Sequence, residues 1–312
     1  MAQAASGFGG IDLSGDPRRR RKEAVIRRSF QGAAVVSVVV SAAIVFSLLG
    51  RAVYFLAQVD LSTLFAPSDG WFPRRGSFDV MTIFAGTLLV SGIAMLVAAP
   101  LGLGAAIYLS EYAKPRVRRY LKTILEILAG VPSVVLGFFA ITWITPQIVE
   151  RVFPGAQFFN MAAAGTAVGI LITPLVASVA EDAFRSVPQS LREASYGMGA
   201  RKRSTTLNVV VPAAVSGVVA ALILALSRAI GETMIVAIAS GATGGSAFTL
   251  DPAAPGQTMT AAMTALAIGS DQVRGTEGTF ESLYFIGLLL FLITLALNVA
   301  SDRFVRRVRQ KY

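Results

Sequence analysis

Long apolar runs, separated by short charged segments, dominate the sequence. Six runs approach or exceed the roughly 20 residues that an α-helix needs to cross the hydrocarbon of a bilayer. They cover residues 31–57, 82–109, 123–148, 160–180, 209–238 and 282–302. The pattern predicts an all-α, polytopic membrane protein with six transmembrane helices, the first at 30–58.

Composition supports this class. Of the 312 residues, 54% are hydrophobic and 15% are charged, and the mean hydropathy is +0.64. The chain has no cysteine and no histidine. Disulfides, thiolate or imidazole metal sites and Cys or His nucleophiles are therefore excluded. We expect neither a cofactor nor a metal, and any chemistry must use arginine, lysine, carboxylates, hydroxyls or the backbone.

Residues 1–29 are polar and end in the basic block "RRRRKEAVIRR". A block this charged cannot be buried, so we expect a basic tail that is disordered except near the membrane. The apolar run that follows is longer than the 7–15-residue core of a signal peptide, which indicates a helix that is retained.

The distribution of basic residues predicts the orientation. Seven of the 28 lysines and arginines lie in the N-terminal tail, and five lie in each of the 110–122 loop, the 182–208 loop and the C-terminal tail. The opposite side carries five, and Arg228 alone lies within a span. The positive-inside rule then predicts a plasma-membrane protein with both termini cytoplasmic. This topology accounts for the net charge of +10 and argues against a nucleic-acid partner.

Glycine and proline interrupt several runs. Pro132 in "GVPS" and Pro174 in "LITPL" indicate kinks, candidates for gating, that a spanning helix tolerates when neighbours satisfy the freed backbone groups. "GTAVG", 165–169, has the small-xxx-small spacing of closely packed helices. In the outer segment, Met259 to Ile268 is too short to span and is typical of a re-entrant or interfacial helix.

The 182–208 loop contains a specific pattern. Glu193, Ala194 and Ser195 are followed by three residues, Gly199, nine residues and "VVVP" ending at Pro212. This resembles the E-A-A, three residues, G, nine residues, I-x-L-P pattern of ABC importer permeases. The resemblance implies that a short helix, followed by a turn at Gly199, seats in a cytoplasmic ATPase.

Three further stretches, "GVPSVVLGFFA", "AFRSVPQSLREASYGMGA" and "SRAIGETM", resemble the phosphate-specific ABC importer permeases, the paired PstC and PstA subunits. The resemblance covers a permease core at 78–310, and "GETM" with the long outer segment favours PstC. It implies an importer of inorganic phosphate that includes a second, homologous permease subunit, cytoplasmic ATP-binding subunits and an extracytoplasmic phosphate-binding protein. The chain has no G-x-x-x-x-G-K-[ST] loop, so we expect it to be no enzyme and ATP hydrolysis to occur in a partner.

Arg228 and Glu232 lie within an apolar run. Four residues apart on one helix, they are close enough to pair. One interpretation is an ion pair that fixes helix register. The other is a substrate contact, because a guanidinium presents a planar fork of donors to an oxyanion, and the resemblance places this segment on the phosphate pathway. Glu232 then either neutralises Arg228 or accepts a hydrogen bond from protonated phosphate.

Glu126 is a further candidate, near the cytoplasmic end of the third predicted helix. It either contributes to the substrate pathway or is a carboxylate that lies at the membrane interface or pairs with Lys122.

Two alternative functions remain open at this point. Arg228 does not distinguish phosphate from molybdate or sulfate, so a permease for another oxyanion is one alternative. A secondary transporter is the other, although such proteins commonly contain internal repeats, which are not evident here.

Overall fold

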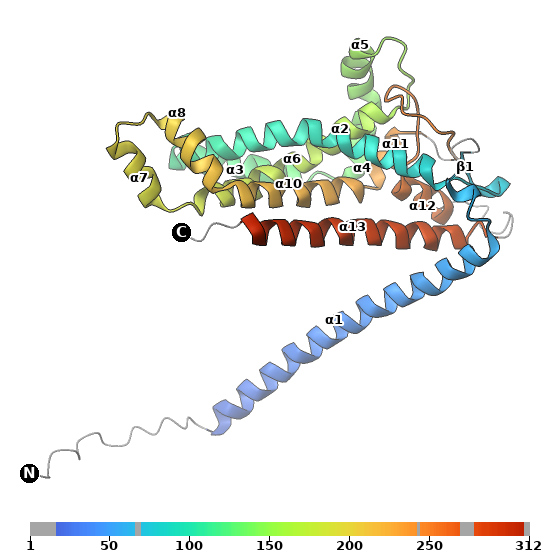
Figure 1. The fold of residues 1–312 in the computed structure, drawn as a ribbon, viewed down its shortest axis with the longest axis horizontal. Helices are drawn as coiled ribbons and strands as arrows, with labels where there is room; N and C mark the ends of the chain where they lie inside the picture. Colours follow the sequence, from blue (N-terminus) through green and yellow to red (C-terminus); the bar gives the residue numbers. More distant parts are fainter. Residues whose placement is uncertain (1–16, 66–69, 242–243, 269–277, 309–312) are drawn as a thin grey trace, which may run out of the picture. The chain divides into compact units, whose positions relative to one another are not determined.

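The computed structural model describes residues 17–65, 70–241, 244–268 and 278–308 (Figure 1). The chain divides into two compact units, residues 1–50 and 51–312. The first unit contains most of helix α1 (Pro17–Gln58), and the second contains every other element. Within the described residues the helix begins at Pro17, so residues 17–29 of the basic tail are helical where they lead into the first apolar run; residues 1–16 lie outside the described part.

Helices dominate the second unit. A short hairpin, β1 (Trp71–Phe72) and β2 (Ser77–Phe78), is flanked by the 3₁₀ turns η1 (Thr63–Phe65) and η2 (Pro73–Arg75). The remaining elements are α2 (Val80–Ile107), η3 (Tyr108–Tyr112), α3 (Pro115–Ala129), α4 (Ser133–Phe139), η4 (Ala140–Val149), α5 (Glu150–Val152), α6 (Met161–Arg185), α7 (Gln189–Gly197), α8 (Lys202–Thr205), η5 (Thr206–Val210), α9 (Val211–Ala213), α10 (Val215–Ile230), α11 (Met234–Ala239), α12 (Met259–Ile268) and α13 (Glu281–Val308).

In the described part of the chain, five helices are long and apolar enough to span a membrane. A sixth span is formed if the helices at Lys202–Ala213 and Val215–Ile230, bent by 69° relative to each other, are counted as one. The all-α fold is therefore confirmed, with six spans when this bent pair is counted as one. Within the second unit, α2, α6, α10 and α13 lie side by side (Figure 1).

Close packing of α2 against α6 forms the centre of this unit. A Cβ added to Gly165 would lie 2.8 Å from Ile93 Cβ, and one added to Gly169 would lie 2.7 Å from Val97 Cβ. Only glycine permits this approach, so the packing predicted from "GTAVG" is confirmed. Both helices are capped at their N-termini, where Asp79 accepts a hydrogen bond from the Met81 amide and Asn160 from the Ala163 amide.

Two predicted spans are interrupted. The run at 123–148 breaks at 130–132, where Pro132 precedes the first residue of α4 and supplies no amide hydrogen. Pro132 therefore separates two helices instead of kinking one. The predicted span at 209–238 differs from the structure at both ends. The helical segment begins earlier, at Lys202, and it is interrupted after Ile230, where α10 ends. Pro174 lies buried inside the continuous helix α6, and its gating role stays a prediction.

The outer segment folds onto the hairpin and α2. Trp71 and Ser246 exchange backbone hydrogen bonds of 2.8 and 2.9 Å. The predicted short helix at Met259–Ile268 is confirmed as α12, and its N-terminus is fixed by the Thr87 hydroxyl, which accepts a hydrogen bond from the Met259 amide at 3.0 Å. This anchors α12 against the wall formed by α2.

Candidate functional site

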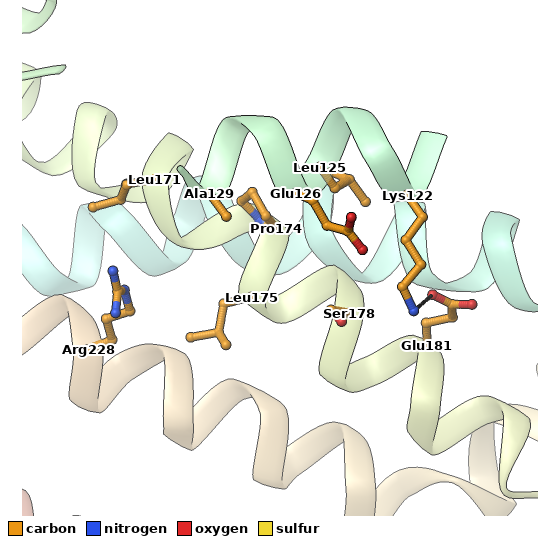
Figure 2. Close-up of a pocket in the computed structure, with 10 residues that line it drawn as sticks. All are labelled: Lys122, Leu125, Glu126, Ala129, Leu171, Pro174, Leu175, Ser178, Glu181 and Arg228. Carbon is orange, nitrogen blue, oxygen red and sulfur yellow. Dashed lines mark ion pairs between the residues drawn. The ribbon is translucent and has the colours of Figure 1, made fainter. Parts of the chain in front are cut away.

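Arg228 lies in the last turn of α10, and its side chain is exposed in the isolated chain. It lines a cavity of about 360 Å³ between α3, α6 and α10. Figure 2 shows Arg228 at one end of this cavity and the ion pair of Lys122 with Glu181 at the other. The other lining residues are Leu125, Glu126, Ala129, Leu171, Pro174, Leu175 and Ser178.

The predicted pairing of Arg228 with Glu232 is wrong. The helix ends at Ile230, so Glu232 no longer continues the helical face that carries Arg228. The Glu232 carboxylate instead accepts a hydrogen bond from the Ile235 amide at 3.4 Å, at the start of α11. Among the described residues, no carboxylate forms an ion pair with the guanidinium of Arg228. A permanently charged guanidinium that lines a cavity and has no ion-pair partner within residues 17–65, 70–241, 244–268 and 278–308 is available to bind an anion.

Glu232 is held at the break between α10 and α11. Its backbone carbonyl accepts a hydrogen bond from the Thr260 hydroxyl of α12 at 2.7 Å. Because its carboxylate caps α11 and it is absent from the residues that line the cavity, its assignment to the substrate pathway stays a prediction that this geometry does not support.

Glu126 supplies a carboxylate to the cavity wall, on α3. It is exposed in the isolated chain, and the alternative that it pairs with Lys122 is wrong. Lys122 instead lies 3.6 Å from Oε2 of Glu181. The cavity therefore carries Arg228, which has no ion-pair partner in the described part of the chain, together with Glu126 and a paired Lys122, while the surface between them is mostly apolar.

Glu181 was not identified from the sequence. Its side chain is 1% exposed; Oε1 accepts a hydrogen bond from Nε of Arg118 at 2.7 Å and lies 2.6 Å from Nη2 of the same guanidinium. The two residues are 63 positions apart and join α3 to α6. The sequence contains only a weak indication of this pair, namely a basic loop at 110–122 and a carboxylate near the end of a predicted span. The two lie too far apart in the sequence for residue spacing to predict their contact.

The 182–208 loop forms the predicted short helix, α7, which ends at Gly197. Glu193 and Ala194 are exposed on it, whereas Ser195 is buried and its hydroxyl lies 2.9 Å from the Thr205 hydroxyl. Gly199 has a φ of +80°, a left-handed conformation that favours glycine. The predicted turn at Gly199 is thus confirmed, while docking of an ATPase stays a prediction.

Comparison with known proteins places the chain in a family. Residues 98–311 match the family described as "binding-protein-dependent transport system inner membrane component". The phosphate transport system permease protein PstC of Mesorhizobium japonicum is 30% identical over 305 residues, which is 92% of this chain and 90% of that protein. PstC of Xylella fastidiosa is 30% identical over 264 residues, or 78% of this chain and 79% of the relative.

Solved structures share the fold. One chain of a bacterial alginate ABC transporter, in complex with a periplasmic protein bound to an alginate pentasaccharide, has a TM-score of 0.63 at 14% identity, over 93% of this chain and 98% of that chain. The inward-facing MetNI methionine ABC transporter has a TM-score of 0.53 at 21% identity, over 74% of this chain and 94% of that chain. The polytopic helical chain is therefore an ABC transporter permease, and it belongs to the binding-protein-dependent inner membrane components and, within them, to the PstC family.

Proposed function

We propose that this permease forms one half of the membrane pathway of an ATP-driven importer of inorganic phosphate. The observation that carries the proposal is the guanidinium of Arg228, which lines a cavity between α3, α6 and α10 without an ion-pair partner among the described residues. Relatives named as phosphate transport permeases, 30% identical over most of the chain, support phosphate as the anion.

Arg228 suits a tetrahedral oxyanion. A guanidinium stays charged at physiological pH and can donate two parallel hydrogen bonds to two oxygens of one phosphate. Desolvation strengthens such contacts, because charges attract more strongly in a medium of low dielectric constant. Leu171, Pro174 and Leu175 form an apolar part of the cavity wall, which offers the anion no polar groups that would compete with Arg228. The anion is bound at Arg228 and released along the cavity.

The remaining machinery belongs to partners. A second, homologous permease subunit completes the pathway as a heterodimer, cytoplasmic ATP-binding subunits dock on α7, and an extracytoplasmic binding protein delivers phosphate. The chain itself catalyses no reaction. Its membership of a family of binding-protein-dependent permeases supports this division of labour and disfavours a secondary transporter.

Anion uptake tests the proposal. Vesicles that contain the full complex and its binding protein should accumulate labelled phosphate only when ATP is supplied on the ATPase side. Labelled sulfate and molybdate serve as matched comparisons. Accumulation of either one in preference to phosphate would assign the permease to another oxyanion, and uptake driven by an ion gradient without ATP would reject the ABC mechanism.

A further inference from the structure

Arg192 is a buried arginine on α7, the helix that carries Glu193 and Ala194 on its exposed surface. Its side chain is 10% exposed, and its guanidinium makes four hydrogen bonds. Nη1 donates to the carbonyl of Val187 at 2.6 Å, and Nη2 donates to the carbonyl of Phe184 at 2.8 Å. Arg192 thereby satisfies carbonyl groups at and just beyond the end of α6, where a helix leaves acceptors without partners.

The same guanidinium also binds the far end of α2. Nη2 donates to Oε1 of Glu111 at 2.9 Å and Nε donates to Oε2 at 3.4 Å. Glu111 lies in η3, which directly continues α2, and its side chain is 6% exposed. Ser110 donates a further hydrogen bond to Oε1 at 2.9 Å. One side chain of α7 is therefore joined to both α2 and α6, the two helices that pack most closely in the unit.

A buried ion pair is weak evidence for stability, because removing both charges from water offsets much of their attraction. It fixes geometry instead, since the planar fork of arginine reaches several acceptors in set directions. The exposed pair of Arg306 with Asp302, at 2.8 Å with side chains 77% and 58% exposed, lacks this constraint. The Arg192–Glu111 pair thus has the burial and multiple contacts that a rigid connection requires.

We infer that Arg192 and Glu111 are positioning residues that transmit a displacement of α7 to α2 and α6. The inference rests on the proposed function, in which an ATPase seats on α7. A shift of α7 would pull the end of α6 through Phe184 and the end of α2 through Glu111. Helix α6 carries Pro174, Leu175 and Ser178 of the cavity wall, so the movement reaches the site at Arg228. Without the pair, α7 moves while the cavity stays in place.

The test uses the full complex, with its ATPase, second permease and binding protein, reconstituted in vesicles. ATP hydrolysis and uptake of labelled phosphate are measured together for Glu111→Gln, Arg192→Gln and Arg192→Lys. We expect the Gln variants to raise the ATP hydrolysed per phosphate imported by about fivefold or more, the lower range of coupling between distant sites. Arg192→Lys keeps the charge, but its three donors on one nitrogen cannot reproduce the four hydrogen bonds of the guanidinium, so we expect partial rescue relative to Arg192→Gln.

Arg306→Gln is the matched control, because it breaks an exposed arginine–carboxylate pair, and it should leave the ratio unchanged. A purely structural pair would lower uptake only in proportion to the amount of assembled complex, at a constant ratio, and this result would overturn the inference. Failure of all three variants to assemble would likewise assign the pair to folding alone. If the unaltered complex imports no phosphate, the proposed function is wrong. If the unaltered complex imports phosphate and the variants have the same ratio of ATP hydrolysed to phosphate imported, only the role inferred for Arg192 and Glu111 is wrong.

Discussion

The guanidinium of Arg118, on α3, holds the carboxylate of Glu181, on α6, through a hydrogen bond from Nε to Oε1 of 2.7 Å and an ion-pair contact of 2.6 Å between Nη2 and the same oxygen. The partners differ in exposure, since the side chain of Arg118 is 25% exposed and that of Glu181 is 1% exposed. Oε2 of Glu181 accepts no hydrogen bond among the described residues, and Lys122 lies 3.6 Å from it. The carboxylate therefore depends on Arg118, whereas Arg118 can reach water.

This asymmetry predicts unequal effects of removing the two partners. Arg118→Ala leaves a buried carboxylate with Lys122 alone and should destabilise the protein by about 3 kcal/mol. Glu181→Gln keeps an acceptor in place and leaves a cation that can be hydrated, so we expect a loss of about 1 kcal/mol. Thermal unfolding of the purified protein in detergent measures both. Equal melting temperatures for the two variants would contradict the dependence of Glu181 on Arg118.

A second prediction concerns the contact of α6 with α2. In Gly169→Leu the new Cβ would meet Val97 Cβ at 2.7 Å and the Ala94 carbonyl at 2.8 Å, so the helices must separate. Overpacking of this kind typically costs about 1–3 kcal/mol, and the yield of folded protein in detergent should fall. Gly92→Ala, on α2 with open space at its Cβ, is the control and should be neutral or slightly stabilising. Normal yield and melting temperature of Gly169→Leu would refute the close approach.

Hydrophobic runs predicted most of the helices because burial in lipid requires long apolar segments and internally bonded backbone. The predicted span at 160–180 corresponds to α6, and the short helix at Met259–Ile268 was placed without error. The predictions failed where the backbone leaves the helix inside an apolar run, at 130–132 and after Ile230. Hydropathy contains little information about such breaks, since apolar residues continue on both sides of them.

The site was predictable only in part. Arg228 was identified because a charge within an apolar run requires an explanation. Its partner was assigned by helical spacing, and this failed because α10 ends before Glu232. The pairs Arg118–Glu181 and Arg192–Glu111 join residues 63 and 81 positions apart. Such contacts depend on how α3, α6 and α7 pack, which a single sequence does not specify.

Arg228→Lys provides a third prediction. Lysine keeps the positive charge but loses the bidentate fork, so one charge-assisted hydrogen bond to the anion is lost. Such a bond contributes about 1.5–3 kcal/mol, which corresponds to a fall in phosphate uptake of about 10- to 100-fold. Uptake is measured in vesicles after assembly has been verified. Glu232→Gln is the control: it keeps an oxygen that can accept the hydrogen bond from the Ile235 amide, so it should retain most of the uptake. Unimpaired transport by Arg228→Lys would reject the bidentate contact.

The orientation of the permease gives a fourth prediction, motivated by the 22 basic residues assigned to one side. A reporter that is active only in the cytoplasm, fused after Tyr312, should be active, because the positive-inside rule places both tails in the cytoplasm. A reporter that requires export should be inactive at the same position. The reverse result would invert the topology and place α7 on the wrong side for an ATPase.

The turn after α7 provides the last prediction. Gly199 has a φ of +80° with no atom within 4 Å of an added Cβ, so a substitution there acts through backbone strain alone and not through a clash. A β-branched residue in this conformation costs of order 1–3 kcal/mol, so Gly199→Val should distort the turn and reduce both ATPase association and phosphate uptake. Asparagine adopts the left-handed conformation more readily than other residues with a side chain, and Gly199→Asn should retain most of both. Co-purification of the ATPase with each variant measures the difference. Equal association for Val and Asn would show that the left-handed turn is not required for docking on α7.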